Sequence, residues 1–81
     1  MALVTVYTRD GCHLCEDALA ALVRLRGELG FDLEALDIEA DDALQKAYLE
    51  RIPVIALNGE ELYDFFLDEA DLRRRLGAAG R

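Results

Sequence analysis

The 81-residue sequence has no tryptophan, one proline, one histidine and two cysteines, and it is poor in basic side chains. Nine Lys and Arg residues stand against 17 Asp and Glu residues, so the formal net charge is −8. Affinity for nucleic acid comes mostly from basic side chains that neutralise phosphates, so this charge argues against a nucleic-acid partner. No apolar run approaches the roughly 20 residues that a membrane-spanning helix needs, and no membrane partner is expected.

The small number of histidines and cysteines also argues against a metal centre within the chain. Structural zinc commonly takes four protein ligands. Here the candidates are Cys12, Cys15 and the adjacent His13, and that adjacency is not a usual ligand spacing. We therefore expect no closed metal site and no tightly bound cofactor.

Length and composition indicate one small domain, spanning residues 1–81. Hydrophobic residues make up 53% of the chain, which excludes a mainly disordered protein. Residues 1–6 have no basic region and no cleavage signal of a secretory leader. We therefore expect a cytoplasmic protein, and we expect it to be a monomer.

Both cysteines lie in the stretch 7–15, which reads Tyr-Thr-Arg-Asp-Gly-Cys-His-Leu-Cys. Because they are three positions apart, their side chains share one face of a helix. An apolar run precedes them and an amphipathic pattern follows, so the pair falls where a strand ends and a helix begins. The N–H groups and dipole at a helix start stabilise an anion, and the thiolate is the nucleophilic form of cysteine. We predict that Cys12 attacks and Cys15 resolves; two inert core thiols are the alternative.

The hydrophobic period predicts an α/β chain in the order strand, helix, strand, helix, strand, strand, helix. The expected strands are 2–7, 31–38, 54–57 and 61–63, and the expected helices are 12–29, 42–49 and one that Asp68 caps. Asn58 and Gly59 indicate a hairpin, so two parallel strands and an antiparallel hairpin would form a four-stranded mixed sheet with three helices. Helices would cover both faces of this sheet, and the tail 77–81 should fray.

The same pattern predicts which side chains point inward. The first strand should be central and buried on both faces, and the second should lie nearer an edge. The inward-facing apolar residues are expected to be Leu14, Ala18, Leu19, Leu22, Val23 and Leu25 on the first helix, Phe31, Leu33 and Ala35 on the second strand, Leu44, Ala47 and Tyr48 on the second helix, and Leu72 and Leu76 on the last. The arginines at 73–75 suit a solvated helix end, where cations complement the dipole.

Two segments carry a family resemblance. The stretch 7–15 resembles the Tyr-Ser/Thr-Lys-x-x-Cys-x-x-Cys motif of glutaredoxins, and residues 51–54, Arg-Ile-Pro-Val, resemble their Thr-Val-Pro segment. Over nearly its whole length the chain is similar to glutaredoxin-like proteins of the thioredoxin-fold superfamily, above all to a short bacterial group with a Cys-His-Leu-Cys site. The resemblance implies a thioredoxin-like fold and thiol–disulfide exchange.

The resemblance also implies roles around the substrate. Pro53 would follow a cis peptide bond and lie against the dithiol, and the backbone of Ile52 would pair with an extended peptide or with glutathione. Arg9 takes the place of the family's lysine, where it would bind a substrate carboxylate and stabilise the thiolate, unless it simply pairs with Asp10. His13 replaces the common proline; it either tunes the thiolate near neutral pH or is an exposed helix-start residue.

The chain departs from the family at residues 62–69. Glutaredoxins carry a Gly-Gly-x-Asp-like turn there, which holds the glutamyl end of glutathione, and this stretch has no paired glycines. Phe65 and Phe66 could line an apolar substrate groove or plug the end of the sheet. We expect the plug, because aromatic clusters are more often core. The acidic surroundings also suit anionic glutathione poorly.

The sequence thus predicts a small thiol–disulfide oxidoreductase that acts on a disulfide in a protein or in a small thiol compound. Glutathione or a flavoenzyme of the thioredoxin-reductase type would supply the electrons. Two alternatives remain open. One is a redox-sensing or electron-relay interaction module, and the other is a protein that binds a metal or an iron–sulfur cluster through Cys12 of two chains.

Overall fold

The computed structural model describes residues 2–79, and its element order agrees with the predicted one. The elements are β1 (Leu3–Thr8), α1 (His13–Leu29), β2 (Asp32–Asp37), the 3-10 turn η1 (Ile38–Ala40), α2 (Asp42–Tyr48), β3 (Val54–Leu57), β4 (Glu60–Asp64) and α3 (Glu69–Ala79). The short turn η1 was not expected. Fraying was predicted from residue 77, but α3 continues to Ala79; residues 80 and 81 lie outside the described part.

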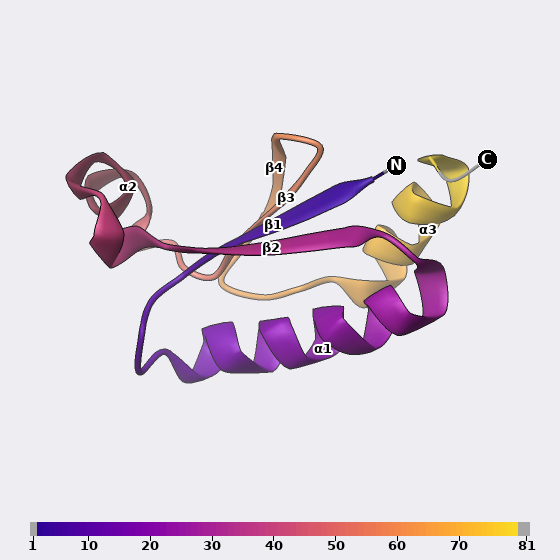
Figure 1. Ribbon diagram of the computed structural model, residues 1–81, viewed down its shortest axis with the longest axis horizontal. Helices are drawn as coiled ribbons and strands as arrows, with labels where there is room; N and C mark the ends of the chain where they lie inside the picture. Colours follow the sequence, from indigo (N-terminus) through magenta and orange to yellow (C-terminus); the bar gives the residue numbers. More distant parts are fainter. Residues whose placement is uncertain (1, 80–81) are drawn as a thin grey trace.

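The strands form one mixed sheet in the order β2-β1-β3-β4. β1 pairs in parallel with β2 and antiparallel with β3, and β3 pairs antiparallel with β4. The central place of β1 and the edge place of β2 are therefore confirmed. α1 and α3 lie on the same side of the sheet, whereas α2 lies beyond the carboxyl end of β2 (Figure 1).

Local chemistry explains the turns that join these elements. Asn58 and Gly59 both have positive φ values, 51° and 88°, as a two-residue hairpin with the twist of its strands requires. Gly30 ends α1 in the left-handed conformation, and its N–H donates to the Arg26 carbonyl at 2.8 Å. Asp68 accepts a hydrogen bond from the Asp71 amide at 3.0 Å, which confirms its role as a helix cap.

The core lies between the sheet and the pair of helices α1 and α3. The sheet contributes alternate residues of its central strands to this core, among them Val4, Val6 and Ile55. From α1 it takes Leu22 and Leu25, and from α3 it takes Leu72 and Leu76. All of these side chains are at most 6% exposed, so most of the molecule's apolar burial sits on this one face.

The predicted apolar stripe of α1 is too broad. Leu14 and Val23 were expected inside, but they are 56% and 55% exposed. The buried residues of α1 are Cys15, Ala18, Leu22 and Leu25, at spacings of three and four. Leu14 and Val23 are each one position away from a buried residue, which is about 100° around the helix and turns them toward solvent.

Two further residues that were predicted to point inward, Ala47 and Ala35, are exposed. Ala47 is exposed, and α2 has no buried residue, because this helix lies past the end of the sheet and does not cover a face of it (Figure 1). Only its last residue, Tyr48, stacks on the sheet, with its ring centroid 4.1 Å from that of Tyr7 in β1. Ala35 is in register with buried Val6, but its small side chain stays exposed on the edge strand β2.

The arginines of α3 are held by acids on the protein itself. Arg73 donates to Glu28 at 3.0 Å, and Arg74 and Arg75 donate to Asp71 at 3.0 and 2.7 Å. The three side chains are exposed, as predicted, but they were expected near the end of the helix, and the last turn of α3, which continues to Ala79, contains no basic residue. Within residues 2–79, no helix combines the length and the apolar composition that crossing a membrane requires.

The core position of Leu72 leads to a stability prediction. Leu72→Ala should lower the free energy of unfolding by about 2–5 kcal/mol, because a fully buried leucine leaves a cavity when it is truncated. Val23→Ala, at an exposed site of α1, should change it by less than about 0.5 kcal/mol. Urea titration of the oxidised protein measures both, and equal effects would contradict this account of the core.

The hydrogen bonds of Asp71 lead to a prediction about the stability of the protein at low pH. The Tyr63 hydroxyl donates to its carboxylate at 2.6 Å and Arg75 at 2.7 Å, and these hydrogen bonds lower the pKa of Asp71 from 3.8 to about 2. A lowered pKa contributes stability above pH 3.8, which is lost as the pH falls toward 2. Asp71→Asn should therefore be less stable than the parent at pH 7, and this difference should shrink between pH 4 and about 2 in thermal unfolding.

Candidate functional site

Cys12 is the N-cap of α1, one residue before the first helical residue. The loop from β1 reaches it through Gly11, whose φ of 79° is readily adopted by glycine. The Sγ atom of Cys12 accepts a hydrogen bond from the Cys15 amide at 3.2 Å, and the Cys12 carbonyl accepts one from the Glu16 amide at 3.0 Å. The sulfur thus takes the place that a Ser or Asp oxygen takes in an ordinary helix cap.

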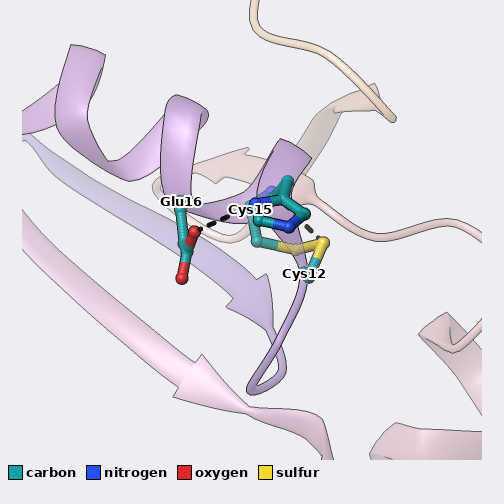
Figure 2. Close-up of a disulfide and its surroundings, with 4 residues drawn as sticks. Cys12, Cys15 and Glu16 are labelled. Carbon is teal, nitrogen blue, oxygen red and sulfur yellow. Dashed lines mark hydrogen bonds and ion pairs between the residues drawn. A yellow bond between two sulfur atoms is a disulfide. The ribbon is translucent and has the colours of Figure 1, made fainter.

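Cys12 and Cys15 form a disulfide across this first turn, with their Cα atoms 5.2 Å apart (Figure 2). The two sulfurs have different surroundings. Cys15 begins the buried stripe of α1 and is 0% exposed, whereas Cys12 is partly exposed. A reagent in solution can therefore approach Cys12 and not Cys15.

Two electrostatic effects at this end of α1 act in opposite directions on a thiolate at Cys12. The free N–H groups and the dipole of the 17-residue helix favour a thiolate at Cys12. Glu16 adds a negative charge in the first turn, which disfavours it. The His13 ring lies 3.5 Å from the Glu16 carboxylate, and its side chain is 95% exposed. This exposure fits the helix-start alternative for His13.

The Ile52–Pro53 segment lies at the same end of the sheet as the disulfide. Val54, the next residue, pairs with Tyr7 near the end of β1, and β1 leads directly into the cysteine loop. The Ile52–Pro53 peptide bond is cis, which confirms that expectation, and Pro53 is buried. Ile52 is half-buried and outside the strand register, so its backbone is not committed to the sheet.

Arg9 lies in the loop between β1 and Cys12 and is exposed. Within residues 2–79 it makes no ion pair, with Asp10 or with any other acid. The alternative in which Asp10 binds Arg9 therefore receives no support. Its side chain is exposed to solvent in the loop that leads to Cys12.

Arg51 is a residue of this region that the sequence analysis missed. Its guanidinium makes two 3.0 Å hydrogen bonds to the Asp64 carboxylate and one of 2.6 Å to Glu61. It also lies 5.3 Å from the ring centroid of Tyr48, whose hydroxyl donates to Glu61 at 2.6 Å. Arg51 thereby ties the loop before Pro53 to β4.

The pKa values in this cluster follow from its contacts. The hydrogen bond from Arg51 lowers the pKa of Asp64, and hydrogen bonds from Tyr48 and Arg51 lower that of Glu61. Tyr48 shows the reverse effect: its hydrogen bond to Glu61 and its burial raise the pKa of the phenol. Both carboxylates are therefore charged at neutral pH, and Arg51 stays engaged with them.

The prediction for Phe65 and Phe66 is wrong. They were expected to plug the sheet, but they are 52% and 65% exposed. Both line a shallow groove of about 180 Å³ between α1 and the segment that follows β4. From this segment Leu67, and neither phenyl ring, packs against the core.

The family model that describes the glutaredoxin-like domain (DUF836) matches residues 3–77. The chain belongs to this glutaredoxin-like family. Among curated proteins it is similar to the uncharacterized protein Rv0508 of Mycobacterium tuberculosis and to Mb0520 of Mycobacterium bovis. Each is 33% identical over 75 residues, which covers 86% of this chain and 77% of the relative.

Solved structures of similar chains agree with this family. Protein Ne2328 from Nitrosomonas europaea superposes with a TM-score of 0.79 at 34% identity, over 91% of this chain and 89% of the other. Target protein XcR50 from X. campestris superposes with a TM-score of 0.74 at 39% identity, over 93% and 96%. Fasciola hepatica thioredoxin reaches 0.67 at 17% identity, over 95% and 79%, which confirms the thioredoxin-like fold. The glutaredoxin-like protein therefore has a redox-type cysteine pair on a thioredoxin fold.

The unequal exposure of the two sulfurs can be tested by alkylation. After reduction, iodoacetamide should modify Cys12 at least about ten times faster than Cys15, because only Cys12 is accessible and is held at the helix start. Peptide mass spectrometry of samples quenched in time measures the two rates. In urea the rates should converge, which is the control; equal rates in the folded protein would contradict the arrangement.

Proposed function

We propose that this protein is a dithiol disulfide oxidoreductase in which Cys12 is the nucleophile and Cys15 the resolving thiol. One observation supports this more than any other: the two sulfurs can bond to each other at a helix start, while only Cys12 is exposed. Inert core thiols would both be buried. The family match supports a redox role. The assignment of Cys12 as the nucleophile and Cys15 as the resolving thiol rests on the geometry.

In the first step the Cys12 thiolate attacks one sulfur of a substrate disulfide. The S–S bond of the substrate breaks, one half leaves as a thiolate, and the other half remains bound to Cys12. In the second step the thiolate of Cys15 attacks the Cys12 sulfur. The second half leaves, and the Cys12–Cys15 disulfide closes, so the substrate gains the two electrons that the protein dithiol loses.

Return to the dithiol requires an external reductant, which is a thiol such as glutathione or a flavoenzyme of the thioredoxin-reductase type. The physiological disulfide belongs to a protein or to a small thiol compound, and the reaction suits a reducing compartment such as the cytoplasm. In this proposal Arg9 meets an anionic group of the substrate, which its exposed side chain supports. The backbone of Ile52, beside Pro53, pairs with an extended chain, which its position outside the strand register supports, and exposed His13 lies at the rim of the site.

Cysteine variants test the assignment. Cys12→Ser should reduce turnover of a disulfide substrate to the background rate, because the accessible nucleophile is gone. Cys15→Ser should keep the first step and stop at a mixed disulfide, which intact-mass spectrometry detects as a stable adduct. Turnover is measured with glutathione and with a thioredoxin-reductase system separately.

The outcomes separate the alternatives. If Cys15→Ser forms no adduct, or if Cys12→Ser retains turnover, the assignment of roles is wrong. If the parent protein reacts once with a disulfide and neither reductant sustains turnover, a sensor or relay module is the better description. Iron and zinc analysis of the freshly purified protein tests the remaining alternative of a bridging metal or cluster.

A further inference from the structure

The groove between α1 and the β4–α3 segment adjoins the redox site. It is lined by Leu14 and Ala18 of α1 and by Phe65 and Phe66. Leu14 stands between the two cysteines in the sequence, so one wall of the groove begins at the disulfide turn. Figure 1 shows the segment between β4 and α3 running alongside α1.

The walls of this groove are unusually apolar for exposed surface. Leu14, Phe65 and Phe66 are 56%, 52% and 65% exposed, and they account for three of the seven large apolar side chains exposed in the described residues. Contiguous exposed apolar groups of this kind mark binding sites more often than isolated ones do. Two phenyl rings and the leucine of the disulfide turn would bind an apolar side chain that flanks a substrate cysteine.

The backbone holds these rings outward. Phe65 has a φ of 70°, a left-handed conformation that is uncommon for a residue other than glycine. Its amide donates to the carbonyls of Arg51 at 3.2 Å and Pro53 at 2.8 Å, and the Phe66 amide donates to the Asp64 carbonyl at 2.8 Å. The Arg51–Asp64 pair closes the same turn through side chains. Backbone strain of this kind persists where the surroundings impose it, and it clusters at functional sites.

The charge at the groove is negative. Asp17 is exposed on its α1 side and makes no ion pair in the part of the chain that the structure describes. Glu69, the other acid of the groove, is bound to Arg24 at 3.0 Å. With a net charge of −8, the surface disfavours a ligand with two carboxylates and favours one that carries a cation.

We propose that the groove formed by Leu14, Phe65 and Phe66 binds an extended segment of a substrate protein that has an apolar side chain next to its half-cystine and a Lys or Arg facing Asp17. The inference rests on the proposed disulfide exchange and adds its substrate class. Glutathione, which offers no apolar side chain and carries two carboxylates, is then a poor partner for the oxidised or reduced site.

The test follows a single turnover of the reduced protein, which supplies both electrons itself. Short peptides with one cysteine are each joined by a disulfide to 5-thio-2-nitrobenzoate, so that the leaving group is constant and coloured. The flanking residues are Phe and Lys, Phe and Glu, or Ser and Lys, and a fourth substrate carries glutathione in place of the peptide. The second-order rate constant for release of the coloured thiolate is measured by stopped flow.

The Phe–Lys peptide should react about tenfold faster than the Ser–Lys peptide, as expected when a phenyl ring is buried against the groove. Phe66→Ala should lower this Phe-to-Ser ratio several-fold. Asp17→Asn should lower the preference for Lys over Glu by about threefold, which is typical of one exposed ion pair. Val23→Ala removes a comparably exposed side chain of α1 outside the groove and serves as the matched control, with both ratios unchanged.

The results distinguish the two proposals. If no substrate reacts, the proposed disulfide exchange fails. If all four react equally, or if the glutathione substrate is the fastest, exchange stands and the groove proposal is overturned. The groove could instead bind a second copy of this chain, and sedimentation velocity at increasing protein concentration tests this alternative. If the parent protein dimerises and Phe66→Ala abolishes the dimer, the groove binds a second copy and the proposal is overturned.

Discussion

The first turn of α1 is the constraint on which the site depends. A helix that starts at this point needs an acceptor for its free amides, and the Cys12 sulfur is that acceptor for the Cys15 amide. The same turn directs Cys15 into the buried stripe of the helix, where core packing holds it at 0% exposure. One turn of backbone therefore makes two chemically identical side chains unequal, and that inequality is what a two-step exchange requires.

The sheet brings the second part of the site to this turn. β1 ends in the cysteine loop and pairs with β3, so the Ile52–Pro53 segment arrives at the same end of the sheet. Arg51 then ties this segment to β4 by charged hydrogen bonds, and its carbonyl accepts the Phe65 amide at 3.2 Å. The cysteine pair, the Ile52–Pro53 segment and the turn at Phe65 and Phe66 are thus held together by strands that lie far apart in the sequence.

The segment after β4 separates this chain from the general family pattern. Where glutaredoxins have a glycine-rich turn, this chain has two phenylalanines exposed beside an acid and a leucine, Asp17 and Leu14. The side chains that line this groove offer apolar contact and negative charge next to the disulfide turn. The difference from the glycine-rich turn thus lies beside the cysteine pair and leaves the two sulfurs unchanged.

Much of this protein is determined by its sequence alone. The periodicity of apolar residues specifies the strands and helices, the Asn58–Gly59 pair specifies the hairpin, and the cysteine spacing at a strand-to-helix junction specifies the dithiol site, because each depends on neighbours within a few residues. Motif resemblance adds the fold and the cis bond at Pro53. These features survive in the structure with boundaries shifted by one or two residues.

Tertiary structure decided which side chains are covered. An irregularity in the β3–β4 register leaves Leu62 without a partner, so Glu61 and Asp64, three positions apart, come to the same face and can both bind Arg51. Periodicity could not reveal this, because residues three apart on a regular strand face opposite sides. The outward position of Phe65 likewise follows from the hydrogen bonds that its amide donates to the Arg51 and Pro53 carbonyls, and only the folded chain brings these carbonyls within reach.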